Sequence, residues 1–307
     1  MTRLVLGTRN SRLALAQTAL VVERLQALTP GIEIEILDMT TTGDRVLDRP
    51  ISEVGTKGLF TKELDEALLQ GAIDAAVHSM KDLPAEIPHG ITIGAVPGRA
   101  SPFDCLLALG PATLDGLPSA SRLGTSSVRR RAQLAVHRPD LEIVEMRGNL
   151  DTRWRKLEQG DCDALVLAQA GVERLGWGTR VREVFTPDVC LPAPCQGTLA
   201  VTIRSGDERV HGLVTPLTDA IAAAEAACER AFLAELGGGC AVPASGLARI
   251  GPDGRHRFRC LVSSLDGSRT ACDTSEGRVE DAGVIGRDAA RRVLASGGRE
   301  LLESAGS

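Results

Sequence analysis

Arginine recurs in three short polar turns, each placed between a predicted strand and a predicted helix. The turns are 7–12 (GTRNSR), 124–131 (GTSSVRRR) and 147–153 (RGNLDTR). Cations in the first turn of a helix oppose its positive end, at roughly 0.3–1 kcal/mol each. A bound anion would offset that cost, and the planar guanidinium binds carboxylate or phosphate through paired hydrogen bonds. We therefore expect a ligand with several acidic groups.

Two alternatives bear on that ligand. The arginines could instead lie at the surface and pair with Asp140, Glu142 or Glu145, which would contribute only about 0–1 kcal/mol per pair. A phosphate ligand is less favoured than a carboxylate one, because neither G-x-x-x-x-G-K-[ST] nor G-x-G-x-x-G after a strand is present.

One carboxylate lies among these cations. Asp82 follows Lys81 just after a predicted buried strand at 73–77. An aspartate at a helix N-terminus is one interpretation. The other is a carboxylate that stabilises positive charge as it develops in a reaction. His78 could act as a general acid or base, although a histidine at a strand end is more often a structural group.

Cys240 follows three glycines at the end of a predicted helix over 219–236. Glycines end helices and leave the backbone open to close approach. The thiol could be functional, or it could be a small buried apolar group. The eight cysteines include no C-x-x-C pair and no histidine at zinc-site spacing, so we expect reduced thiols and no metal site.

Lys57 and Phe60 lie in a second glycine-containing stretch, VGTKGLF at 54–60. It could form a mobile cationic loop near the ligand. Alternatively it is an ordinary helix entry with Phe60 in the core.

Strands and helices alternate through the first two thirds of the chain, which is typical of α/β folds with parallel sheets. Residues 40–52 are expected to form an irregular loop. The helix over 12–28, capped by Ser11, would bury Leu13, Leu20, Val21, Leu25 and Leu28. The predicted strands are 3–7, 32–39, 73–77, 91–96, 104–109, 141–146, 163–167 and 198–203, and the further helices are 58–69, 127–137, 149–158 and 168–175.

Pro/Gly-rich stretches at 97–102 and 191–197 predict two crossings between domains. Domain 1 would comprise 1–98 with 198–216, and domain 2 residues 102–193. Domain 3, over 218–307, would be a small α+β domain with strands at 241–250, 256–264 and 269–274 and a helix at 281–296. Ligands of open α/β sheets bind at the C-terminal ends of the strands, so a cleft between the first two domains is expected.

Composition argues against a nucleic-acid-binding protein and against a membrane protein. The net charge is −5, tyrosine is absent, and there are two Trp and five Phe, which argues against nucleic-acid binding. No secretory signal and no run of 18 apolar residues is present, so we expect a cytoplasmic protein with no membrane contact.

The motifs, in this order, closely resemble those of the porphobilinogen deaminase (hydroxymethylbilane synthase) family over essentially the whole length. Beyond the three arginine turns, the resemblance rests on these segments: Leu13–Gln17, Thr41–Asp44, Lys57–Phe60, His78–Asp82, Gln196–Gly197 and Gly239–Cys240.

The resemblance implies two lobes like those of periplasmic binding proteins plus a small third domain. It implies an enzyme, a transferase of porphyrin and haem biosynthesis, acting as a monomer. Four porphobilinogen molecules would be deaminated and joined head to tail, and the growing oligopyrrole chain released as the linear tetrapyrrole hydroxymethylbilane. A dipyrromethane cofactor would be attached through a thioether to Cys240.

Residue roles follow from matching positions. Asp82 would be the catalytic carboxylate, and Lys57 and Phe60 would belong to a mobile loop. The cofactor would be held by Ser79, Lys81, Thr125, Ser127, Arg129, Arg130, Arg147 and Gly148. Substrate would be bound by Arg9, Ser11, Gln17, Arg147, Arg153, Arg174 and Gln196.

Three positions depart from the family pattern. Cys195 stands where many members have glycine before Gln-Gly, Glu53 where others can carry Lys, and Thr42 where some have Arg. These put hinge stiffness and loop contacts in question, and leave Asp82 and Cys240 untouched. The alternative function is a two-lobed protein that binds anions and catalyses no reaction. The carboxylate of Asp82 among the arginines argues against this alternative, because it would repel an anion.

Overall fold

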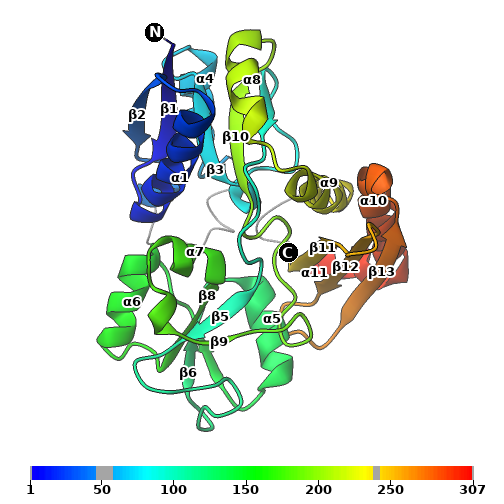
Figure 1. The fold of residues 1–307 in the computed structure, drawn as a ribbon. Helices are drawn as coiled ribbons and strands as arrows, with labels where there is room; N and C mark the ends of the chain where they lie inside the picture. The colour runs from blue at the N-terminus through cyan, green and yellow to red at the C-terminus, as the bar shows by residue number, and fades with distance from the viewer. Residues whose placement is uncertain (1, 46–57, 238–242, 306–307) are drawn as a thin grey trace. The chain divides into compact units, whose positions relative to one another are not determined.

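The computed structural model describes residues 2–45, 58–237 and 243–305 (Figure 1). By its contacts the chain divides into two compact units, Met1–Ala100 with Thr198–Ala223, and Ser101–Gly197 with Ala224–Ser307. Within the described ranges, no helix combines the length and apolar character needed to cross a membrane.

The first unit is built on a five-stranded sheet in the order β2-β1-β3-β10-β4. Strand β10 runs antiparallel to both of its neighbours, and the β1–β2 and β1–β3 pairs are parallel. The strands are β1 (Arg3–Arg9), β2 (Glu33–Met39), β3 (Ala75–Ser79), β4 (Ile91–Ala95) and β10 (Leu199–Arg204).

Helices cover both faces of this sheet. Leu4 and Leu6 of β1 share a core with helices α1 and α8, whereas Val5, between them, packs with α4. Alternate strand residues point to opposite faces, so α4 lies on the other side. The helices are α1 (Arg12–Leu28), α2 (Thr42–Arg45), α4 (Lys62–Leu69) and α8 (Glu208–Val214), with 3-10 turns η1 (Met80–Asp82) and η3 (Thr215–Leu217).

The second unit contains a sheet with the same arrangement, in the order β7-β6-β8-β5-β9. Here β5 is the antiparallel strand. The strands are β5 (Asp104–Leu107), β6 (Arg122–Gly124), β7 (Glu142–Val144), β8 (Ala164–Ala168) and β9 (Val181–Val184). The helices are α5 (Val128–His137), α6 (Leu150–Glu158) and α7 (Gln169–Arg174), with η2 (Gly178–Arg180).

The C-terminal part of the chain adds an antiparallel three-stranded sheet and helices, with Phe232 and Phe258 in edge-to-face contact at 5.3 Å in their core. Its helices are α9 (Ala220–Glu235), α10 (Ala282–Val293) and α11 (Arg299–Ala305), with η4 (Val279–Asp281) and a π-helical turn at Leu294–Gly298. Its strands are β11 (Ala244–Ile250), β12 (His256–Ser263) and β13 (Thr270–Gly277).

The predicted fold class is therefore confirmed: two α/β lobes, each with four of five strands running one way, and a small α+β part. Strands β5 and β10 depart from an all-parallel sheet. Residues 42–45, expected in a loop, form α2, and the helix expected from residue 58 begins at Lys62. The short elements β6, β9, α8 and α11 were not among the predicted ones.

The buried face of α1 also differs from the prediction. Val21 and Leu25 are buried as expected, but Leu20 and Leu28 are exposed. Gln17 lies on the buried face instead. Hydrophobicity alone could not identify that glutamine, because its burial depends on a polar partner elsewhere in the sheet.

Candidate active site

All three arginine turns are helix N-termini, as predicted, and each has a side-chain cap, of which the sequence predicted Ser11. Ser11 Oγ accepts from Ala14 N at 3.3 Å, Ser127 Oγ from Arg130 N at 3.4 Å, and Asn149 Oδ1 from Thr152 N at 2.9 Å. Because they cap α1 and α5, Ser11 and Ser127 have a local structural function in addition to any contact with a ligand. The first turns of these two helices contain no acidic residue.

The candidate residues also lie at the C-terminal ends of parallel strands. In the first unit, Arg9 ends β1 and Ser79 ends β3. In the second, Thr125 follows β6 directly and Arg147 follows β7, while α7 follows β8. In each unit, the edge of the sheet formed by these strand ends therefore carries polar and cationic groups, as expected for a ligand site.

Two contacts join the predicted residues of the first unit. Gln17 Nε2 donates to Ser79 Oγ at 2.8 Å. The Arg9 guanidinium lies over the Phe60 ring, 4.5 Å from its centroid, in a cation–π contact. Arg9, Gln17, Ser79 and Phe60, which are far apart in sequence, are therefore held in one unit in two contacting pairs.

Phe60 is half-buried and packs against the turn at Gly43. Gly43 N donates to Leu59 O at 2.8 Å, and a Cβ on Gly43 would lie 2.3 Å from Phe60 Cε1. A side chain at Gly43 would displace the ring that lies against Arg9. Lys57, the other residue predicted in this stretch, is outside the described residues.

Asp82 is in η1, immediately after the strand end at Ser79, and Lys81 precedes it. Its side chain is half-buried. No hydrogen bond or ion pair joins the carboxylate to another residue within the described ranges. Asp82 is the last residue of this three-residue turn and does not begin a helix, so the structure does not support the helix N-terminal interpretation.

His78 is a structural group. Its side chain is buried, and Nε2 lies 3.0 Å from Thr202 Oγ1 on the neighbouring strand β10. Burial, and secondarily the positive charge of Arg9, lower the pKa of His78 to about 4. The imidazole is therefore neutral near pH 7, which does not favour the acid–base alternative.

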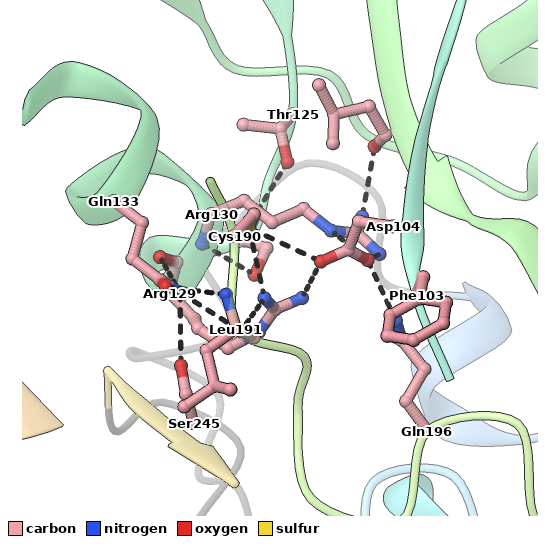
Figure 2. A network of polar contacts seen from close by, with 12 residues as sticks. Phe103, Asp104, Thr125, Arg129, Arg130, Gln133, Cys190, Leu191, Gln196 and Ser245 are labelled. Carbon is pink, nitrogen blue, oxygen red and sulfur yellow. Dashed lines mark hydrogen bonds and ion pairs between the residues drawn. The ribbon is translucent and has the colours of Figure 1, made fainter. Parts of the chain in front are cut away.

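A buried carboxylate that the sequence did not indicate organises the second unit (Figure 2). Asp104 Oδ2 accepts from Arg129 Nη2 at 2.8 Å, and Oδ1 accepts from Arg130 Nε at 3.0 Å and Nη2 at 2.8 Å. Gln196 Nε2 also donates to Oδ1, at 2.8 Å. Arg129 and Arg130 hold the pKa of Asp104 well below its usual range despite complete burial.

These ion pairs revise the environment expected for Arg129 and Arg130. The sequence left open surface pairing with Asp140, Glu142 or Glu145, but both guanidinium groups are buried against Asp104. Arg129 Nη1 also donates to Leu191 O at 2.8 Å and Arg130 Nη1 to Val166 O at 3.0 Å.

Gln133 joins this network to the C-terminal sheet (Figure 2). Its Nε2 donates to Leu191 O at 3.1 Å and to Ser245 Oγ at 3.0 Å, and its Oε1 accepts from Leu191 N at 2.8 Å. Helix α5, which carries Arg129 and Arg130, is thereby hydrogen-bonded to the start of β11.

A second cationic group surrounds the start of α6. Arg153 Nε donates to Gly148 O at 2.7 Å. Gly148 has φ 109°, and a Cβ there would lie 2.7 Å from Thr152 Cγ2, so glycine is required. Burial, then the charges of Arg130 and Arg147, lower the pKa of Arg153 to about 10. Arg147 itself pairs with Glu145 at 2.5 Å, one of the carboxylates considered from the sequence.

Arg174, near the end of α7, donates from Nη2 to Gly197 O at 2.6 Å. Burial lowers its pKa to about 10. The arginine remains charged near neutral pH, and a desolvated cation of this kind favours an anionic partner.

The thiols fall into two groups. Seven cysteines in the described ranges are free; six are buried, and Cys272 is exposed. Cys195 has φ 62°, a left-handed backbone that favours glycine, and its N–H donates to the buried Glu229 carboxylate. Cys240 lies outside the described residues.

Comparison with solved structures gives distant similarities. The VFT2 domain of BvgS from Bordetella pertussis is 14% identical, covering 70% of this chain and 85% of that chain, with a TM-score of 0.42. A putative methionine-binding lipoprotein from Bacillus subtilis is 12% identical, covering 69% and 88%, also with a TM-score of 0.42.

Similarity to curated proteins is much higher. Porphobilinogen deaminase from Roseiflexus sp. (strain RS-1) is 46% identical over 97% of this chain and 98% of that protein. The enzymes of the same name from Moorella thermoacetica and Bacillus velezensis are each 44% identical over 99% of this chain, and over 96% and 97% of their own lengths.

Two family models match nearly the whole sequence. Residues 4–212 match "Porphobilinogen deaminase, dipyromethane cofactor binding domain". Residues 223–295 match "Porphobilinogen deaminase, C-terminal domain". The chain therefore belongs to the porphobilinogen deaminase family.

Proposed function

We propose that this chain is a transferase that deaminates porphobilinogen and joins four molecules head to tail, giving the linear tetrapyrrole hydroxymethylbilane for porphyrin and haem biosynthesis. The observation that carries this proposal is the match of both family models, together covering residues 4–212 and 223–295. The cationic strand ends support it, because each pyrrole of the substrate bears an acetate and a propionate.

The second unit fits a dipyrromethane cofactor chemically. Arg153 has a lowered pKa because it is desolvated and lies near the cations Arg130 and Arg147. Carboxylates of a bound group would relieve that repulsion and form charge-assisted hydrogen bonds, each worth about 1.5–3 kcal/mol. We assign the cofactor contacts to Ser79, Lys81, Thr125, Ser127, Arg129, Arg130, Arg147 and Gly148.

When bound, the cofactor supplies the pyrrole carbon to which the first substrate unit is joined. Cys240 is the proposed point of thioether attachment. Arg129 and Arg130 contribute their positive charge from behind the N-terminus of α5, where Asp104 holds both guanidinium groups. The backbone N–H groups of that helix end add to the attraction for carboxylates.

Substrate carboxylates are assigned to Arg9, Arg147, Arg153 and Arg174. The further substrate contacts are assigned to Ser11, Gln17 and Gln196. Phe60 supports this arrangement by lying against Arg9, 4.5 Å from the guanidinium carbon to the ring centroid. Lys57 and Phe60 are proposed to belong to a loop that moves as the oligopyrrole grows.

Asp82 is the proposed catalytic residue. Loss of ammonia from porphobilinogen leaves a cationic methylene-pyrrole, and a carboxylate that accepts from pyrrole N–H groups stabilises the positive charge. A preorganised carboxylate supplies this stabilisation without reorganising at the moment of reaction. The carboxylate is open to such a ligand, since no described residue forms a hydrogen bond or ion pair with it.

For domain organisation we propose three domains: 1–98 with 198–216, then 102–193, then 218–307. We further propose a monomer that acts in the cytoplasm without nucleic-acid or membrane partners. The seven free cysteines in the described ranges are consistent with a reducing compartment. Light scattering after size-exclusion chromatography would test the monomer.

The test of the function is incubation of the purified protein with porphobilinogen, following ammonia release and the mass of the pyrrole product. The proposal expects four ammonia molecules per linear tetrapyrrole. Binding of porphobilinogen without ammonia release would reject it and favour an anion-binding protein. Asp82→Asn is the matched control, because it keeps the arginines while removing the charge-stabilising carboxylate.

A further inference from the structure

An arginine side chain lies against two neighbouring indole rings in the second unit. The Arg180 guanidinium carbon is 4.2 Å from the ring centroid of Trp154 and 4.1 Å from that of Trp177. The two indoles are 6.1 Å apart with their planes inclined by 52°. These are the only two tryptophans of the chain.

This stack joins two helices that carry proposed substrate ligands. Trp154 directly follows Arg153 on α6. Trp177 lies three residues beyond Arg174, and its backbone N–H donates to Val172 O of α7 at 3.0 Å. Each indole is therefore attached to the backbone that carries one of the two arginines.

Local contacts fix the direction of each substrate arginine, but not the spacing between them. Arg153 Nε donates to Gly148 O, and Arg174 Nη2 donates to Gly197 O. Each contact holds one guanidinium, whereas the stack links α6 directly to the segment that ends α7. Loss of the stack would remove one direct link between the two segments that carry these arginines.

The stack also shows how Arg180 is held. Trp177 is 7% exposed, and Trp154 Nε1 donates to Glu158 Oε1 at 2.7 Å, which orients its indole. Arg180 Nη1 is buried and has no hydrogen-bond partner in the described structure. The guanidinium is thus held chiefly by its contacts with the two indole rings, which lysine reproduces only in part.

We propose that Arg180 is a positioning residue for substrate: in contact with the rings of both Trp154 and Trp177, it sets the spacing of Arg153 and Arg174. The inference rests on the proposed function, because it assumes that these two arginines bind carboxylates of porphobilinogen or of the growing chain. Small misplacements of binding groups reduce catalytic efficiency strongly, so the effect is measurable in kinetics.

The experiment compares the holoenzyme with Arg180→Ala and Arg180→Lys. We expect Arg180→Ala to raise KM for porphobilinogen by about tenfold while kcat stays within about twofold, because charge stabilisation at Asp82 is unaffected. Arg180→Lys should recover part of the loss. Tryptophan emission should shift on Arg180→Ala, because both fluorophores belong to the stack.

Arg155→Ala is the matched control, an exposed arginine on the same helix α6. It should leave KM and emission unchanged. If Arg180→Ala fails to fold, Trp154→Leu removes one of the two rings that contact Arg180 and should show the same rise in KM. A changed emission spectrum with an unchanged KM would overturn the positioning role. Absence of turnover in the unmodified enzyme would instead reject the proposed function.

Discussion

Asp104 and Arg130 form a completely buried two-point ion pair, in which Oδ1 accepts from Nε at 3.0 Å and from Nη2 at 2.8 Å. The other carboxylate oxygen accepts from Arg129. One aspartate therefore pairs with two adjacent guanidinium groups at the N-terminus of α5 and holds both side chains in place, while the cluster keeps a net positive charge.

Asp104→Asn should destabilise the protein, because two buried cations would lose their shared counter-charge. Breaking a buried ion pair by removing one partner costs about 3–5 kcal/mol. Urea unfolding monitored by circular dichroism would measure the loss. Asp188→Asn is the control: its ion pair with Arg259 is exposed, and its removal should leave the unfolding midpoint almost unchanged. Equal midpoints for the two variants would contradict this role of Asp104.

His78 should make stability fall with acid. Its pKa is about 4 in the folded protein and about 6.5 when unfolded, so the unfolded state binds more protons between these values. The contribution is complete above about pH 6.5 and is lost as pH falls towards 4, up to about 3 kcal/mol.

His78→Gln, which retains a polar group facing Thr202, should flatten this part of the stability–pH profile. The exposed His89→Gln should not. Unfolding free energies measured at several pH values from 4 to 7 would check both. A profile of His78→Gln with the slope of the unmodified protein would show that the imidazole is not the titrating group.

Asp82→Asn should fold normally and lose at least about 10–100-fold in turnover, because a charge-assisted interaction with the cationic intermediate is replaced by a neutral one. Steady-state kinetics with porphobilinogen would measure the loss, and calorimetry would confirm the fold. Near-normal turnover would exclude the charge-stabilising role.

Local features of the fold could be predicted from the sequence. The helices that begin after Ser11, Ser127 and Asn149 were predicted close to their observed starts, and the cap at Ser11 was predicted because capping depends on neighbouring residues. The antiparallel direction of β5 and β10 could not be predicted, because strand direction depends on how the chain returns to each sheet and not on residue type. Gln17 of α1 was missed as a buried residue for a similar reason, since its partner Ser79 is 62 residues away.

Site residues that belong to a short sequence motif could be predicted. Residues whose role depends on contacts with distant parts of the chain could not. Asp104 precedes an apolar segment and carries no local signal, and its partner Arg129 is 25 residues away. The sequence identifies Cys195 as a departure from the glycine of the family pattern, and its φ of 62° lies in the left-handed region that favours glycine.

Intact-protein mass spectrometry tests the central claim most directly: that this enzyme uses a cofactor joined to Cys240. The purified protein should exceed its sequence mass by two pyrrole units, and peptide mapping should place them on Cys240. Cys240→Ser should lack the addition, whereas Cys272→Ser, at an exposed free thiol, should retain it. An active enzyme of unmodified mass, or an adduct on another cysteine, would contradict the account.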